Sequence, residues 1–159
     1  MRIYDGNNIR NIALLGESGA GKSNMTSALE FTAKLTNKIP NSSDNVKISS
    51  SLALHAIEYQ SFKFNFFDVP GYVDFFGELE SGLAACDGAI ITVDGTADLS
   101  VGTETALELA DSRNIPRFIF VNKIDSEKAD YEKILLQLRK KYGKRIAPFH
   151  VPWGVAANF

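Results

Sequence analysis

A glycine-rich turn between an apolar strand and an amphipathic helix constrains the fold of this chain more than any other feature. Residues 12–15 are apolar and predict a short buried strand. They run into Gly16-Glu17-Ser18-Gly19-Ala20-Gly21-Lys22-Ser23, which has the spacing G-x-x-x-x-G-K-[ST]. Next come apolar positions at helical spacing, namely Met25, Ala28, Leu29, Thr32 and Leu35. This order predicts a phosphate-binding turn at the end of a sheet strand.

The chemistry of the turn explains its composition. Glycines let the backbone wrap a phosphate so that several N–H groups point inward, and the start of the helix adds a favourable dipole. Lys22 can reach the β- and γ-phosphates, and the hydroxyl of Ser23 can ligate Mg²⁺. The alternative is a flexible loop that matches by chance, which the flanking strand and helix disfavour. The predicted phosphate site comprises Gly16, Glu17, Ser18, Gly19, Ala20, Gly21, Lys22, Ser23 and Asn24.

The rest of the chain alternates short apolar segments with amphipathic ones. Strands are predicted at residues 52–59, 62–68, 89–93 and 118–121, and Gln60-Ser61 predicts a hairpin turn between the first two. Helices are predicted after Asp74 (with Phe76, Leu79, Leu83 and Cys86 buried), over residues 103–114, and between Asp130 and Gly143. Such alternation predicts an α/β fold with a doubly wound, mostly parallel sheet and helices on both faces.

Two further motifs end predicted strands. Asp68-Val69-Pro70-Gly71 ends the phenylalanine-rich strand, where in P-loop proteins an acid holds Mg²⁺ through water and a glycine N–H senses the γ-phosphate. Asn122-Lys123-Ile124-Asp125 ends the strand at 118–121. The Asp125 carboxylate can accept both guanine N1–H and the exocyclic N2 amine, whereas adenine offers neither donor. Asn122 and Lys123 are expected to brace the phosphate loop and the base loop, which is the segment from Asn122 to Asp125. The sequence therefore predicts a guanine-nucleotide site.

Composition limits the setting of this site. The chain has 159 residues, which is enough for a single domain, with 45% hydrophobic and 23% charged residues and a net charge of -2. The charge disfavours strong direct binding to nucleic acid. A single cysteine, Cys86, and no apolar run of membrane-spanning length favour a monomer in the cytoplasm without membrane association.

Residues 65–75, whose sequence is NFFDVPGYVDF, resemble the second switch of elongation factor G, and residues 77–80, 85–89, 101–105 and 115–121 extend the match. The chain thus resembles the GTP-binding domain of elongation factor G-like translational GTPases. It is most similar to the divergent bacterial elongation factor G-like paralogues, which also carry tyrosine after the second-switch glycine. The resemblance implies hydrolysis of GTP to GDP on the ribosome, with Mg²⁺. It also implies a catalytic set of Lys22, Gly71 and Tyr72, since Tyr72 stands where the family has a histidine.

In the loop before Leu52, Ser49, Ser50 and Ser51 are all candidate Mg²⁺ ligands, and the alternative is a solvated serine-rich turn. The resemblance aligns the first-switch threonine with Ser49, or with Ser50 if the gap is placed differently.

Three other departures from the family pattern qualify the resemblance. Gly19 replaces an acidic residue of the phosphate loop, and the first switch is short, with Val46-Lys47-Ile48-Ser49 in place of its usual core. The sequence also contains no Ser-Ala loop to support guanine O6. We therefore expect residues 1–159 to be one GTP-binding domain core, truncated before the inserted subdomain and that loop.

Three functions fit these features. The first is a ribosome-dependent GTP hydrolase, which could be a translocase, a ribosome-protection protein or a release-type factor. The second is a GTP-dependent binding switch with little turnover, which Tyr72 and the altered first switch favour. A small-molecule kinase is disfavoured, because the Asn122 motif would have no purpose there.

Overall fold

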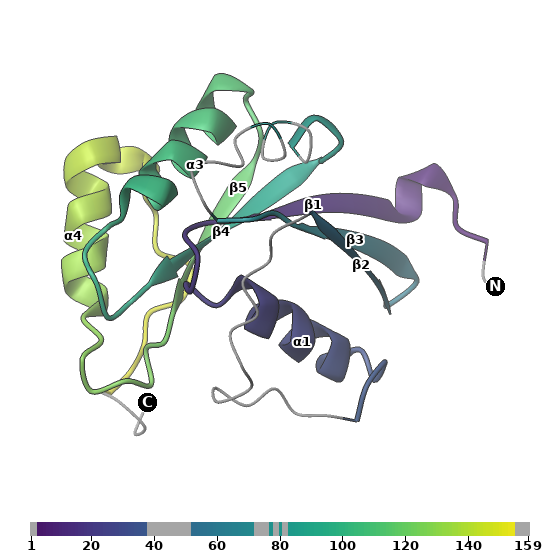
Figure 1. Ribbon diagram of the computed structural model, residues 1–159, viewed down its shortest axis with the longest axis horizontal. Coiled ribbons are helices and arrows are strands. Elements are labelled where there is room, and N and C mark those ends of the chain that lie inside the picture. The colour runs from purple at the N-terminus through teal and green to yellow at the C-terminus, as the bar shows by residue number, and fades with distance from the viewer. Residues whose placement is uncertain (1–2, 38–51, 72–76, 78–79, 81–82, 155–159) are drawn as a thin grey trace.

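The computed structural model describes residues 3–37, 52–71, 77, 80 and 83–154 (Figure 1). Its strands are β1 (Ile9–Leu15), β2 (Ala53–Tyr59), β3 (Phe62–Asp68), β4 (Gly88–Asp94) and β5 (Arg117–Asn122). Its α-helices are α1 (Lys22–Thr32), α3 (Val101–Ser112) and α4 (Tyr131–Tyr142), and short 3₁₀ turns cover Gly6–Asn8 and Gly143–Arg145. Each predicted strand is present in the described chain, with bounds that differ by at most three residues.

The strands form one sheet in the order β2-β3-β1-β4-β5. Among the described strands, β3, β1, β4 and β5 run parallel to one another, and β2 pairs antiparallel with β3 as its hairpin partner. The hairpin turns at Gln60 and Ser61, whose φ angles of 46° and 69° are left-handed. The predicted fold class is therefore confirmed, and the parallel strands all end along one edge of the sheet.

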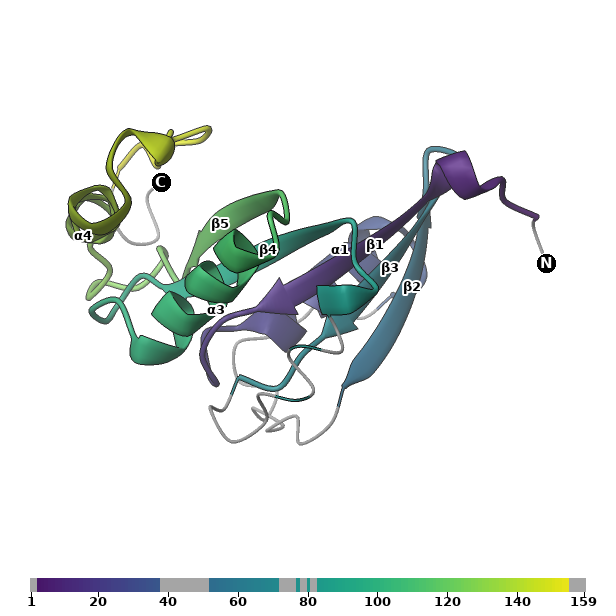
Figure 2. The ribbon, with the colours of Figure 1, turned by 90° about the horizontal axis from the view of Figure 1, so that it is seen from above.

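Helices cover both faces of the sheet. In Figure 1, α1 lies below the sheet and α3 above it, and Figure 2 shows α3 from the side that it covers. The α3 face holds the larger core, which includes Leu15, Ile91, Leu107, Ile134 and Leu138, all nearly inaccessible to solvent. The α1 face holds a smaller core, formed by Leu14, Ile57 and Phe66 with Met25 and Leu29 against it. Alternate residues of the central strands serve the two cores, so β1 is apolar over residues 12–15 and β4 over residues 89–91.

The first helix differs from its prediction at its end. It stops at Thr32, because Lys34 turns into the left-handed region with φ 60° and the amide of Leu35 donates to the carbonyl of Glu30. Leu35 is consequently 54% exposed, and the prediction that it continues the buried helical face is wrong. The fully buried side chains of α1 are instead polar, namely Lys22 and Thr26.

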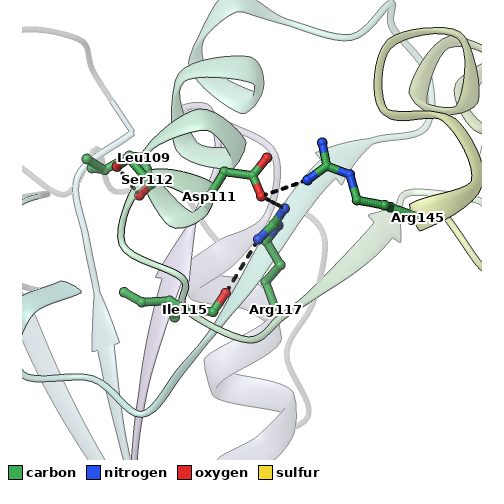
Figure 3. A network of polar contacts seen from close by, with 6 residues as sticks. All are labelled: Leu109, Asp111, Ser112, Ile115, Arg117 and Arg145. Atoms are coloured by element: carbon green, nitrogen blue, oxygen red, sulfur yellow. Dashed lines mark hydrogen bonds and ion pairs between the residues drawn. The ribbon is translucent and has the colours of Figure 1, made fainter.

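The last helix ends as predicted, and ion pairs tie its basic end to α3. Asp130 caps α4 by accepting from the amide of Lys133 at 2.9 Å, and Gly143, with φ 65°, ends it. Lys141 pairs with Glu104 and Glu108 of α3 at 3.0 and 3.2 Å. A second contact joins three elements, because the carboxylate of Asp111 accepts from both Arg117 of β5 and Arg145 (Figure 3). Lys141 and Arg145, two of the basic residues at or just after the end of α4, therefore form ion pairs within the domain.

The single cysteine lies beside the larger core. Burial and the neighbouring Asp87 carboxylate raise the pKa of the Cys86 thiol to about 11. At pH 8 the thiolate, which is the reactive form, is then about 100-fold scarcer than in an unfolded chain. We expect native Cys86 to react with iodoacetamide about 100-fold more slowly than the guanidinium-unfolded protein, as measured by mass spectrometry over time. Equal rates in the two states would contradict this environment for the thiol.

Candidate nucleotide-binding site

The predicted nucleotide motifs meet at one edge of the sheet. β1 leads into the phosphate loop at Gly16, β3 ends at Asp68, and β5 ends at Asn122. The register pairs Leu14 with Asp68 and Asp94 with Asn122, so these strand ends lie level with one another. Residues far apart in sequence are thereby collected at the carboxyl edge, where ligands of such sheets bind.

Two glycines of the phosphate loop are required by close backbone contacts. Gly16 has φ 124°, and a Cβ there would lie 2.2 Å from the carbonyl oxygen of Thr92 in β4. Gly21 caps α1 with φ 97°, and a Cβ there would lie 2.1 Å from Nδ2 of Asn122. No side chain fits at either position without moving backbone or the base loop. The loop is thus in close contact with both β4 and Asn122 at the end of β5.

Lys22 is held inside the loop. Its side chain is only 7% exposed, and Nζ donates to the carbonyls of Gly16 at 2.8 Å and Glu17 at 3.0 Å. Burial lowers the pKa of Lys22, although the charges of Asp68 and Glu17 act in the opposite direction. The ammonium group is therefore held inside the predicted phosphate loop and is already largely dehydrated, so an arriving phosphate would displace little water from it.

Ser23 and Asp68 form the part of the site that fits a Mg²⁺ ion. The Ser23 hydroxyl donates to Oδ2 of Asp68 at 2.9 Å. Asp68 is 2% exposed, and its Oδ1 has no hydrogen-bond partner among the described residues. A buried carboxylate oxygen without a partner is costly, and a hydrated cation would satisfy it. Among the described residues, no group of three or more histidine, cysteine or acidic side chains is arranged so that it could hold a metal ion.

Gly71 lies against the phosphate loop. A Cβ at Gly71 would be 2.4 Å from the amide nitrogen of Ser18 and 2.6 Å from the carbonyl oxygen of Gly16. Only glycine allows this approach, which brings the end of the Asp68 motif next to the phosphate cradle. Tyr72 and Ser49, predicted as a catalytic residue and a metal ligand, lie outside the described residues.

The base loop is joined to the phosphate loop through Asn122. Its Nδ2 donates to the carbonyl of Ala20 at 2.9 Å. Asp125 is exposed, and the structure gives its carboxylate no hydrogen bond or ion pair with any described residue. Its oxygens are therefore free to accept from a ligand. Lys123 has φ 59°, and its Nζ donates to the carboxylate of Asp94 at 2.5 Å.

The sequence motifs did not point to Asp94, although one signal was available. It is a charged residue placed directly after the apolar run 89–93, at the end of a predicted strand. The carboxyl ends of parallel strands meet, so a charge there falls next to the other motifs.

Comparison with known proteins places the chain in a family. The elongation factor Tu GTP binding domain matches residues 7–152, nearly the whole chain. The protein belongs to this family. Among curated relatives, the mitochondrial ribosome-releasing factor 2 of Culex quinquefasciatus is 34% identical over 91% of this chain and 21% of its own length. An elongation factor G-like protein of Thermotoga maritima is 29% identical over 96% of this chain and 23% of its own.

These relatives confirm the resemblance to elongation factor G-like GTPases. The elongation factor G of Dehalococcoides mccartyi strain CBDB1 is also 29% identical, over 99% of this chain and 24% of its own length. The chain is a GTP-binding domain homologous to theirs, and it spans less than a quarter of the length of these relatives.

Solved structures support the same fold. The protein ttk003000868 of Thermus thermophilus is 29% identical, with a TM-score of 0.75 over 87% of this chain and 23% of its own. Elongation factor SelB of Methanococcus maripaludis, solved with the GTP analogue GppNHp, is 20% identical with a TM-score of 0.65 over 89% of this chain and 26% of its own. At that identity the SelB similarity concerns the fold alone. Among the described residues, no helix has the length and apolarity to cross a membrane.

Proposed function

We propose that this domain binds GTP with Mg²⁺ and hydrolyses it to GDP and phosphate, within a translation factor of the elongation factor G type that works on the ribosome. The observation that carries the proposal is the hydrogen bond from Asn122 to Ala20. It joins a base loop that ends in an unpaired carboxylate, Asp125, to a loop that holds a buried lysine, Lys22. A nucleotide bridging the two loops would meet guanine-selective and phosphate-binding groups in one site.

Each residue has a distinct proposed role. Lys22 stabilises charge on the β- and γ-phosphates, and the N–H of Gly71 detects the γ-phosphate beside the loop it already touches. Ser23 and Asp68 would hold Mg²⁺, which supplies positive charge to the phosphate oxygens, and Ser49 would complete its ligands in the triphosphate state. Asp125 accepts from guanine.

The Tyr72 position determines how fast the domain hydrolyses GTP alone. Phosphoryl transfer depends on a group that orients water in line with the γ-phosphate. A phenol with a pKa near 10 is a poorer partner for that water than the imidazole that the family pattern has at this position. We infer slow intrinsic hydrolysis and completion of the site by the ribosome. The second candidate, a GTP-dependent binding switch, is favoured by the same substitution.

Single-turnover GTP hydrolysis by the full-length protein, measured with and without ribosomes, tests this proposal. We expect ribosomes to accelerate hydrolysis by at least about 100-fold, since supplied catalytic groups achieve this in related GTPases. Tyr72→His should raise the rate with ribosomes if the phenol limits turnover. A wild-type protein that hydrolyses GTP without ribosomes as fast as a stimulated translation factor would contradict the proposal. No turnover under either condition, together with tight GTP binding, would establish the binding switch.

We also infer that residues 1–159 form one domain core in a longer protein, whose downstream sequence adds an inserted subdomain and a guanine-supporting Ser-Ala loop. The outer edge of β5 supports this inference. Phe118 is 70% and Phe120 44% exposed there, and an apolar groove of about 1030 Å³ runs along the strand. Both rings lie on the α1 face of the sheet, since the alternate residues Ile119 and Val121 pack into the core under α3. A further strand paired with β5, together with a helix packed on that face, would cover both rings. A ribosomal role would place the protein in the compartment that holds ribosomes, the cytoplasm in the simplest case.

A further inference from the structure

Asp94, the last residue of β4, and the turn of Gly95 and Thr96 that follows it lie beside the segment between β5 and α4. The turn contacts both ends of that segment. The amide of Gly95 donates to the carbonyl of Asn122 at 2.9 Å, and the carbonyl of Gly95 accepts from the amide of Asp130 at 2.9 Å. A Cβ at Gly95 would lie 2.7 Å from the Asn122 carbonyl oxygen, so the contact requires glycine. The turn therefore fixes where the base loop starts and where α4 begins.

The carboxylate of Asp94 adds the one charged contact between this turn and the base loop that the described residues show. Its Oδ1 accepts from the amide of Thr96 at 2.9 Å and from the Thr96 hydroxyl at 2.6 Å. Its Oδ2 accepts from Nζ of Lys123 at 2.5 Å. Burial alone would raise the pKa of Asp94, but the hydrogen bonds from Lys123 and Thr96 outweigh it and lower the pKa. The group is thus ionised at neutral pH, and Thr96 fixes its orientation.

Lys123 occupies a backbone conformation that needs support. Its φ of 59° lies in the left-handed region, which is strained for a residue that carries a side chain. It follows Asn122, which contacts the phosphate loop, and precedes the exposed carboxylate of Asp125. An ion pair that fixes the Lys123 side chain therefore restrains the segment between the two loops.

We propose that Asp94 is a positioning residue for guanine-nucleotide binding. It holds Lys123, and through it the loop from Asn122 to Asp125, in the binding arrangement before the nucleotide arrives. Asp94 needs no contact with the nucleotide for this role. The affinity gain comes from ordering that the nucleotide no longer has to impose. This inference rests on the proposed guanine site at Asp125.

Titration of the full-length Asp94→Asn protein with GDP and with ADP tests the proposal. Asparagine keeps the size of the side chain and loses the charge, so we expect GDP affinity to fall by about tenfold. Asp98→Asn is the matched control, because Asp98 is an exposed carboxylate that pairs with Lys133 outside the base loop. It should bind GDP as the wild type does. Asp94→Glu keeps the charge and should recover part of the lost affinity.

A double-mutant cycle separates positioning from general stability. If Asp94 acts through Lys123, adding Asp94→Asn to Lys123→Met should change GDP affinity less than about twofold. The same tenfold loss in that background would overturn the proposal, as would wild-type affinity in Asp94→Asn. Thr96→Val serves if Asp94→Asn does not fold, because it removes the hydroxyl that orients Asp94. We expect about a threefold loss, and unchanged affinity would overturn the proposal.

The ADP titration distinguishes failure of the positioning role of Asp94 from failure of the proposed guanine site. A wild-type protein that prefers GDP, combined with an unaffected Asp94→Asn variant, overturns the positioning role alone. A wild-type protein that binds ADP as well as GDP overturns the guanine site, and the positioning proposal with it.

Discussion

Asp125→Asn is expected to weaken GDP binding by about 10³-fold or more and to let xanthosine diphosphate bind in its place. The carboxylate accepts two guanine donors, N1–H and the N2 amine, and a site built for such donors rejects analogues by about 10⁴ or more. An asparagine amide places an N–H opposite the N2 amine, where two donors face each other. Xanthine carries an oxygen at that position and can accept from the amide. Titration of the full-length protein with GDP, XDP and ADP measures all three affinities.

This substitution should leave the fold intact. Asp125 is exposed, and no described residue hydrogen-bonds to its side chain, so thermal unfolding without nucleotide should match the wild type. Glu127→Gln is the matched control, since Glu127 is another exposed carboxylate two residues along the same loop. It should retain GDP affinity and guanine preference. Equal binding of ADP and GDP by the wild type would refute the assignment of Asp125.

Lys22→Ala is expected to lower affinity for GDP and GTP by about 10²- to 10³-fold, the usual effect of removing one member of a buried charge pair. The Lys22 ammonium is held by two loop carbonyls in a buried position, so it is already oriented toward the phosphates. The same burial lowers its pKa, which means that the folded domain gains little from this charge when no nucleotide is bound. Loss of binding should therefore come without loss of the fold.

Thermal unfolding with and without GDP and Mg²⁺ checks both the loss of binding and the retention of the fold in Lys22→Ala. The wild-type protein should unfold at a higher temperature when GDP is present, whereas Lys22→Ala should show almost no shift. Lys128→Ala removes an exposed lysine between the base loop and α4, and this variant should show the same GDP-induced shift as the wild type. A Lys22→Ala protein with native circular dichroism and unchanged GDP affinity would show that the glycine-rich turn is not a phosphate site.

The phosphate and base loops were predictable from sequence because both are short, contiguous motifs at strand ends. The apolar runs indicated the strands, and parallel strands bring their carboxyl ends together. The link between Asp94 and Lys123 was not predictable in this way. It depends on β4 and β5 being neighbours, which the order of elements along the chain does not specify, and on a left-handed Lys123.

The end of α1 shows a different limit. Apolar periodicity predicted that Leu35 continues a buried face, but the left-handed turn at Lys34 ends the helix first. Apolar periodicity shows which positions could share a helical face, but it does not show where the backbone leaves the helical conformation. The roles of Tyr72 and Ser49 stay predictions, since both residues lie outside the described chain.

The outer edge of β5 also determines how the isolated domain should behave in concentrated solution. β5 is the last strand of the described sheet, and no other described strand pairs with its outer edge. The unpaired backbone groups of an edge strand are a template on which another chain can add a strand. Phe118 and Phe120 would add apolar contacts to such a pairing, because both rings are exposed on this strand. Self-association through this edge is therefore the main aggregation risk for a preparation of residues 1–159 alone.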